Sequence, residues 1–497
     1  MVDRRTLRGA MSAKTDMEVT VILPPHLRTP RSKPQVPTDF ARQVFDSLPL
    51  AHASLALFAY GIPESFLADL FKRHRGRCYE DVVTFPQLVA WIFDALIEHK
   101  GSGRQAHIRR HRQRDDACNE AFYGKLRRVP SRLSEAFLRD VTDRLTTLFP
   151  NVVAHRIPTS FDRFDVIILD GKSLKKVAKR LLETRGTPGK LLGGKLLVAY
   201  RPRDGLVLDM ASDLDGETNE AKLIPQLMPR LHARGGLAKL VVGDRLFCAL
   251  KHFNEFTKEN GHFVVRHART LSFESDPKRP AVTTKDASNR TVVEQWGWAG
   301  KPKQKLRRYV RRITVERPTD EAITILTDLL EPDLHPAADL LDLYRIRWGI
   351  ESTFQKVTEI FALGRFIGST PEATVFQASM CFVLSNVVQV LQGYVVSKQK
   401  LTIKDLSTEQ FCKDWHRQLV ALKELVSVPM IVSLIPSDLT AESLVELLDQ
   451  LLGEMWKPGW DKTRNKSPRA HRHAAKQKWA HTSVQRRRQA QKSKVAE

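Results

Sequence analysis

The hydrophobic pattern of the chain changes near residue 164, and this change constrains the fold more than any other feature. "FDVIILDGKSL" is a short apolar run rich in β-branched residues, and "KLLVAYRPRDGLVLDMASDL" is typical of two strands around a turn at residues 203–205. The chain continues with a helical pattern, a strand, a second helical pattern and a last strand, "GHFVVRHA". The order β-β-β-α-β-α-β predicts a mixed sheet with helices packed on it.

Two acidic residues follow apolar strands of this predicted sheet. Asp170 ends "VIILD" and Asp244 ends "LVVGD". Ligands of open α/β sheets bind outside the carboxyl ends of the strands, so the pair marks a candidate site. A single aspartate in such a place more often caps the next turn or helix, and that alternative stays open for each of them.

A third acid lies in "LYRIRWGIESTF", residues 343–354. On a helix, Tyr344, Arg347 and Glu351 project within roughly 60° of one another, because each residue turns the chain by about 100°. Trp348 falls beside them, while apolar residues repeat every four positions on another face. A carboxylate in this setting is either half of a structural ion pair or an active-site acid.

The segment between Asp244 and Glu351 is too long for one loop of a compact sheet. Its middle, from about residue 267 to 325, is polar and strand-like, which predicts a β-rich insertion. It includes "KPKQKLRRYVRR", a run without acids. Lys305, Arg307 and Arg308 of this run are candidate contacts to a phosphate backbone. The alternative is a solvated edge strand that its charges protect.

The charge of the whole chain also points to a polyanionic partner. Lysine and arginine number 80 against 56 acidic residues, which gives a net charge of +24. This balance favours nucleic acid first and a membrane surface second. Residues 39–155 are helical in pattern and contain "GRQAHIRRHRQR", so we expect a helical DNA-binding domain with Arg109 and Arg110 at phosphates. A solvated helix face is the alternative.

The remaining segments complete the predicted organisation. Residues 1–38 are basic and rich in proline, and we expect a disordered arm. The sheet domain would span 156–400, a helical region 401–456, and a disordered basic tail with salt-sensitive DNA affinity 457–497. The uncharged stretch 373–397 carries several polar residues, which predicts a buried core helix and no membrane span. The five scattered cysteines form no CxxC pair, as suits a reducing cytoplasm, and we expect the protein at the nucleoid.

"LDGKSL", "VVGDRLF" and "LYRIRWGIESTF", in this order and with a β insertion before the last, resemble the DDE transposases of bacterial insertion sequences. More narrowly, they are similar to the insertion-sequence-four family, whose signature is Tyr, two residues, Arg, three residues, Glu, six residues, Lys. Tyr344, Arg347 and Glu351 match it, and the resemblance runs from about residue 40 to 450. It implies an RNase H-like catalytic core with a β-rich insertion, flanked by helical N- and C-terminal regions.

The resemblance also implies metal-dependent cut-and-paste transposition. Asp170, Asp244 and Glu351 would hold two Mg²⁺ ions about 3.5–4 Å apart, with Asp170 bridging them, and Mn²⁺ can replace Mg²⁺. Tyr344 and Arg347 would hold DNA phosphates, with Trp348 packed behind. The partners would be double-stranded DNA, as terminal inverted repeats and as target, and a second copy of the chain on the paired ends.

Relatives of this family cut the second strand through a DNA hairpin and stack a flipped base on a tryptophan of the insertion. Trp296 and Trp298 are the candidates here, and strand alternation puts both on one face of the sheet. The alternative for both is a place in the core of the insertion.

One position departs from the signature. Thr358 stands where the family has lysine, and Lys356 projects from a different side of the helix. The departure keeps open a decayed or domesticated copy, that is, a non-catalytic sequence-specific DNA-binding protein. A nuclease that cuts without joining is a third reading.

Overall fold

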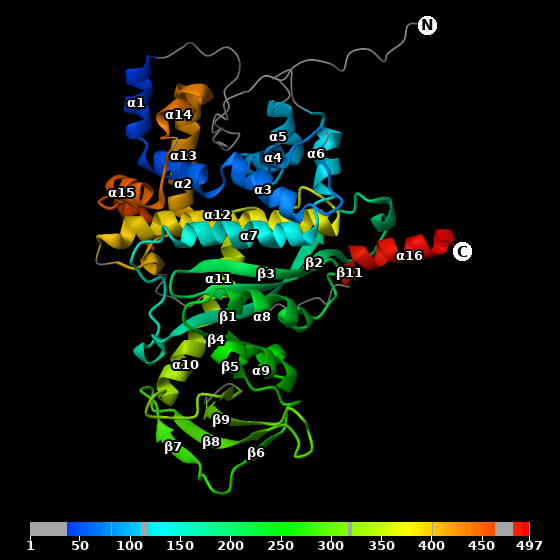
Figure 1. Ribbon diagram of the computed structural model, residues 1–497, viewed down its shortest axis with the longest axis vertical. Helices are drawn as coiled ribbons and strands as arrows, with labels where there is room; N and C mark the ends of the chain where they lie inside the picture. The colour runs from blue at the N-terminus through cyan, green and yellow to red at the C-terminus, as the bar shows by residue number, and fades with distance from the viewer. Residues whose placement is uncertain are drawn as a thin grey trace.

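A helical layer lies on one end of a long mixed sheet, as Figure 1 shows for the computed structural model. The structure describes residues 37–80, 82–110, 117–316, 321–399, 401–436, 438–462 and 481–496. The predicted N-terminal arm therefore lies outside the described residues up to position 36.

The described strands form one sheet, and its first five strands along the chain make its central part. The strands are β1 (Phe164–Val177), β2 (Lys190–Arg201), β3 (Leu206–Asp213), β4 (Ala238–Gly243), β5 (His262–Arg266), β6 (Phe273–Ser275), β7 (Val282–Lys285), β8 (Thr291–Ala299), β9 (Arg308–Val315), β10 (Ile323–Thr327) and β11 (His481–Ser483). β1, β2 and β3 pair antiparallel, and β4 and β5 run parallel to β1. The resulting order β3-β2-β1-β4-β5 is that of an RNase H-like core, so the predicted fold class is confirmed.

The β-rich insertion extends this sheet and does not form a second one. β10 pairs antiparallel with β5, β9 with β10, and β8 with β9, while β6 and β7 both pair with β8. Backbone hydrogen bonds therefore run without a break from the core into the insertion, which holds the insertion in a fixed direction from the core.

Helices from both ends of the chain share one layer. The helices before the sheet are α1 (Thr38–Asp46), α2 (Pro49–Gly61), α3 (Glu64–His74), α4 (Phe85–Ile97), α5 (Gly103–Arg110), α6 (Asn119–Leu126) and α7 (Ser131–Thr146). The later ones are α8 (Ile224–Ala233), α9 (Leu250–Phe256), α10 (Ala337–Ile346), α11 (Trp348–Glu359), α12 (Pro371–Ser397), α13 (Thr408–Leu425), α14 (Val428–Leu434), α15 (Ala441–Leu452) and α16 (Val484–Ala496). α13 and α15 pack on α2, so the N- and C-terminal helical regions meet (Figure 1).

The long apolar helix α12 lies inside the protein. It is long and apolar enough to cross a membrane, but 94% of its most apolar window is buried, against α7, β2 and β3 among others. Its polar residues serve this packing: the Asn386 side chain accepts a hydrogen bond from the Val207 N–H and donates one to the Val207 carbonyl, both at 2.9 Å. The prediction of a buried core helix is confirmed.

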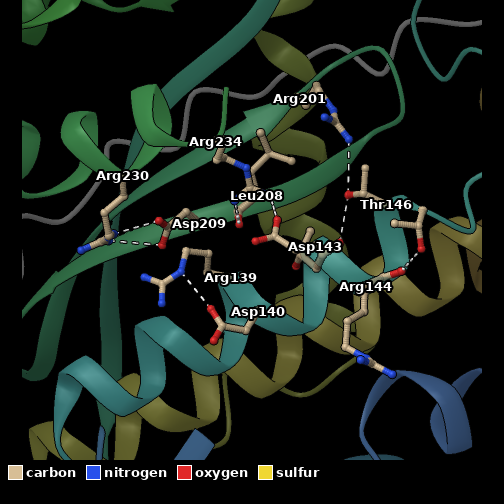
Figure 2. A network of polar contacts seen from close by, with 12 residues as sticks. Arg139, Asp140, Asp143, Arg144, Thr146, Arg201, Leu208, Asp209, Arg230 and Arg234 are labelled. Atoms are coloured by element: carbon tan, nitrogen blue, oxygen red, sulfur yellow. Dashed lines mark hydrogen bonds and ion pairs between the residues drawn. The ribbon is translucent and has the colours of Figure 1, made fainter. Parts of the chain in front are cut away.

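Charged side chains tie α7 and α8 to β3 (Figure 2). Asp209 of β3 is fully buried, and its Oδ2 lies 2.9 Å from Arg230 Nε of α8. Arg230 also reaches Glu135 of α7 at 3.1 Å, and Arg234 pairs with Asp143 of the same helix. Because a buried carboxylate without a partner is strongly destabilising, this network requires α7, α8 and β3 to assemble together.

The predicted disorder of residues 457–497 is wrong for the part after residue 480. β11 pairs in parallel with the start of β2, and α16 follows it. Arg486 lies 2.8 Å from Asp215 and 2.7 Å from Glu217, and Glu217 also accepts the Ser483 N–H. Asp215 and Glu217, which are remote in sequence, neutralise part of the charge of the tail, and β11 of the tail pairs with the free edge of β2. The basic local composition of the tail contains no sign of either contact. Residues 463–480 lie outside the described residues.

Candidate active site

Asp170 and Asp244 lie on neighbouring strands at matching positions. β1 and β4 pair in parallel with Ile168 opposite Val242. Two residues further along each strand come Asp170 and Asp244. Neighbouring strands are about 4.8 Å apart, so the register brings the two aspartates side by side at the end of β4.

Each aspartate uses one oxygen for the local backbone. Asp170 Oδ1 accepts the Gly171 N–H at 2.9 Å, and Asp244 Oδ1 accepts the Arg245 N–H at 2.7 Å, where it caps the short helix η5 (Arg245–Phe247). The capping role considered from the sequence is thus present. It is compatible with a ligand site, because neither bond uses the Oδ2 atom.

Arg347 sits at a tightened turn between α10 and α11, where the sequence pattern predicted one continuous helix. Its backbone stays helical, with φ −48° and ψ −33°. The Arg347 N–H reaches the Tyr344 carbonyl at 3.2 Å, and the Ile350 N–H reaches the Arg347 carbonyl at 3.3 Å. Both bonds span three residues, as in a 3₁₀ turn. Since the turn does not reverse the chain, Tyr344, Arg347 and Glu351 still face the same region.

The guanidinium of Arg347 joins the helix to the strands. Its Nη1 lies 3.0 Å from Glu351 Oε1 and 4.0 Å from Asp170 Oδ2. The Tyr344 hydroxyl lies 3.5 Å from Asp244 Oδ1. The structure therefore brings together the three predicted acids and the two predicted phosphate contacts.

Trp348 does not pack behind this group, and that prediction is wrong. Its side chain is 63% exposed, whereas Arg347 is buried. Trp348 opens α11 on its outer side, and its ring centre lies 5.5 Å from the Arg347 guanidinium carbon. The exposed indole thus lies between the buried Arg347 guanidinium and solvent.

The carboxylates of this cluster exceed the positive charge that it contains. Burial raises the pKa of Asp170 to about 6; Arg347 and the Gly171 N–H oppose this shift, and the negative charges of Glu351 and Asp244 add to it. Three carboxylates thus share one guanidinium. Divalent cations such as Mg²⁺ are held by a few carboxylate oxygens and would supply the missing charge, so these residues fit a metal site.

A second cluster of possible metal ligands lies elsewhere in the chain. Among the residues that the structure describes, the group with ligand atoms all within 4.8 Å of one another is Asp94, Glu98 and His99, near the end of α4. Lys423 Nζ lies 2.9 Å from Glu98 Oε1, so a lysine already neutralises that group.

We expect Asp170→Asn to stabilise the metal-free protein at pH 7 by up to about 3 kcal/mol. The folded-state pKa of Asp170, about 6, lies above the ordinary 3.8, so the folded protein binds the proton more tightly. Stability from this group is full below about pH 4 and is lost as the pH rises through 6. Denaturant unfolding at pH 7 and pH 4 measures the difference. Asp69→Asn, which removes an exposed acid of α3, should change little.

The same samples test metal binding without any activity assay. At about 100 times its dissociation constant, Mg²⁺ or Mn²⁺ should stabilise the native protein by about 2.7 kcal/mol. Asp170→Asn should lose most of this gain. An equal metal response in both proteins would contradict a site at Asp170.

The two tryptophans of the insertion differ in exposure. Trp296 is 3% exposed, its Nε1 donates to the Leu330 carbonyl at 2.9 Å, and the guanidinium of Arg279 lies over its ring. Trp298 is 39% exposed and stands edge-on to Tyr309 with ring centres 5.1 Å apart. Trp296 thus belongs to the core of the insertion, whereas Trp298 is open to a ligand.

The predicted basic contacts are in different situations. Lys305 is exposed, and Arg307 pairs with Glu274 and lies 5.0 Å from the centre of the Trp298 ring. Arg308 donates to Thr257 Oγ1 at 2.6 Å and to the Phe253 carbonyl at 3.3 Å, so it holds the end of α9. Arg109 and Arg110 end α5, and their side chains lie outside the described part of the chain.

Lys172, which was not predicted as a site residue, contacts Thr358 at the place where the family signature has lysine. Lys172 Nζ donates to Thr358 Oγ1 at 3.3 Å and lies 5.0 Å from the centre of the Phe354 ring. Lys172 is two residues beyond Asp170 on β1, so both project to the same face of the strand. The alternation of side chains along the strand could therefore have identified Lys172 from the sequence. An ammonium group therefore stands beside α11 although the helix carries threonine there.

The chain is similar to known proteins in two comparisons. Residues 163–387, which contain all three acids, match the family model of the transposase DDE domain. Among solved structures, the chain is similar to the piggyBac transposase in a synaptic complex with hairpin DNA, at 13% identity, over 87% of this chain and 88% of that one, with a TM-score of 0.35. No curated protein matches the chain significantly.

Proposed function

We propose that the chain, which carries a transposase DDE domain at residues 163–387, is a DNA transposase that cuts and joins strands at the ends of its own element. The observation that carries this proposal is the convergence of Asp170, Asp244 and Glu351 around Arg347. Asp170 lies on β1, Asp244 directly follows the adjacent parallel strand β4, and Glu351 comes from α11, which contacts β1.

Asp170, Asp244 and Glu351 would hold two Mg²⁺ or Mn²⁺ ions. Bound there, the ions would activate the attacking water or 3′-hydroxyl and stabilise the leaving oxygen. Asp170 lies near both other acids, whose negative charges add to the rise of its pKa, so it would share the ions with them as a ligand. Once cations neutralise the acids, the guanidinium of Arg347 and the hydroxyl of Tyr344 are available to orient a DNA phosphate.

Other side chains would complete the grip on the DNA. Lys172 would contact a phosphate near the position that Thr358 leaves without a lysine. Trp298, and not Trp296, would stack on a flipped base if the second strand is cut through a hairpin. Lys305 and Arg307 beside Trp298 would contact the backbone of the same strand.

The wider setting follows the same proposal. The helical N-terminal region would bind the terminal inverted repeats, and two copies of the chain would pair the two ends before joining them to target DNA. We place the protein with the insertion-sequence-four transposases of bacteria, acting at the nucleoid. The rival is a decayed or domesticated, non-catalytic sequence-specific DNA-binding protein, which rests on Thr358 standing where the family has lysine.

The test uses DNA that spans the boundary of the element, labelled at one end. We expect the native protein to cut it at the boundary in Mg²⁺ but not in EDTA, and to join the freed end to a second duplex. Trp298→Ala should slow the step that forms the hairpin, and Lys172→Met should weaken cutting. Metal-dependent cutting without joined product would indicate a nuclease, and tight binding without cutting would indicate the rival.

A further inference from the structure

A groove of about 1460 Å³ runs along α11, where Ser352, Lys356 and Thr358 are among its lining residues. Its walls come from α11, α13, the short helix η7 (Ile403–Asp405) and the segment around His155. Small-molecule pockets measure roughly 300–1,000 Å³, so the groove has room for part of a polymer.

Five lysines of the groove, among them Lys100 and Lys176, have no acidic partner among the described residues. The other three act on one another, because Lys462 lowers the pKa of both Lys356 and Lys404. Lys356, Lys404 and Lys462 line it, and among the described residues none of them has a carboxylate within ion-pair distance. Two other cations on the same walls do pair: Lys413 with Glu409 at 2.8 Å and Arg417 with Asp414 at 3.3 Å. The three lysines are therefore a cluster of uncompensated charge.

The lysines repel one another and act on a histidine beside them. Burial lowers the pKa of Lys356, and Lys462 lowers it further. Burial also lowers the pKa of His155 to about 4, with added effects from Lys404 and Lys356. His155 is held in place by the Tyr200 hydroxyl, 3.0 Å from its Nε2. Like charges gathered in one concave site favour an anionic ligand.

The groove lies one helix width from the catalytic acids. Lys356 follows Glu351 by five residues and projects from a different side of α11. An α-helix is about 10–12 Å across with its side chains, and successive phosphates of a strand advance about 3.4 Å along duplex DNA. A DNA strand with its scissile phosphate at Glu351 would thus pass the groove within about three nucleotides.

We propose that this groove binds the sugar–phosphate backbone of DNA next to the cleavage point, with Lys356, Lys404 and Lys462 as its phosphate contacts. The proposal rests on the proposed function in one respect, namely that the DNA in the groove is the DNA that is cut. The three lysines and their lack of acidic partners among the described residues are observations that do not depend on that function. Electrostatic contacts of this kind make affinity fall steeply with salt.

The test measures how affinity for DNA depends on salt. The probe is a duplex of about 30 base pairs, roughly three helical turns, held in EDTA so that no cutting occurs. Combining Lys356→Gln, Lys404→Gln and Lys462→Gln should reduce the slope of log affinity against log salt by about 2–3, since each phosphate contact contributes about 0.9. The charge-preserving set Lys356→Arg, Lys404→Arg and Lys462→Arg should keep the native slope, which separates charge from folding.

The matched control removes three lysines that already have acidic partners. Lys258, Lys398 and Lys457 lie within 3.3 Å of Glu255, Asp449 and Asp414. Their glutamine variants should change the slope by less than about one. An unchanged slope in the groove variant, or an equal fall in the control, would overturn the proposal.

Two further outcomes are informative. If inorganic pyrophosphate raises the melting temperature of the native protein but not of the groove variant, and the DNA slope is unchanged, the groove holds a small anion and the proposal fails. If the slope falls as expected but the native protein cuts no DNA in Mg²⁺, the groove proposal holds and the proposed function fails.

Discussion

Glu351→Gln is expected to lower metal-dependent cutting of the boundary duplex by roughly 10³-fold or more, the scale for loss of a principal electrostatic group in an active site. Glutamine keeps the length of the side chain, and its carbonyl oxygen can still accept from Arg347 Nη1, now 3.0 Å from Oε1. The negative charge that would hold a metal ion is lost while the packing stays. Initial rates of cutting in Mg²⁺, with saturating protein, measure this effect.

The control for this variant is Glu359→Gln on the same helix. Glu359 is exposed and, within the described ranges, accepts from Gln355 at 3.1 and 3.2 Å, so its loss should leave the rate within about threefold. DNA affinity should be nearly unchanged in both variants. Full cutting by Glu351→Gln would remove Glu351 from the catalytic site and leave the Arg347–Glu351 pair as a structural contact.

The order of strands and the place of the aspartates could be predicted because the signals are local. A β-branched apolar run specifies a strand, and an aspartate at its end specifies where a carboxylate emerges. The register of β1 against β4 then brings Asp170 and Asp244 together without further information.

The features that the sequence did not reveal depend on contacts between distant segments. Trp296 and Trp298 share one strand face, but only Trp296 is covered by the chain near Leu330. The tail is ordered because Asp215 and Glu217 meet Arg486, about 270 residues away. Lys172 reaches Thr358 from another element. Hydrophobic periodicity carries no information about such pairings.

Arg311→Met is expected to destabilise the protein by about 3–5 kcal/mol, although Arg311 belongs to the basic run that predicted a DNA surface. Arg311 is fully buried; its Nε lies 2.8 Å from Glu294 Oε2, and its Nη1 donates to the His335 carbonyl at 2.6 Å. Methionine fills the volume but leaves Glu294 as a buried charge without a partner. Denaturant unfolding measures the loss.

The double variant Arg311→Met with Glu294→Leu separates the cost of the orphaned charge from the cost of lost packing. It should recover most of the stability, because replacing both partners of a buried pair by apolar residues is often neutral. Arg312→Met, which removes a hydrogen bond to the neutral Gln295 and a cation–π contact to Phe273 but orphans no charge, should cost about 1–2 kcal/mol. If Arg311→Met is as mild as Arg312→Met, the buried pair does not hold the insertion together.

Arg311 also shows that some basic residues of this chain stabilise the fold and are not available to bind DNA. The double variant removes a cation from the basic run, yet it should keep the native dependence of DNA affinity on salt, since a fully buried guanidinium cannot meet a phosphate. A fall of about 0.9 in the slope would mean that the insertion opens to expose Arg311 to DNA. Substitution of lysines without acidic partners, such as Lys356, should instead reduce the slope of log DNA affinity against log salt. The chain's net positive charge thus predicts a partner, but the ion pairs determine which residues can touch it.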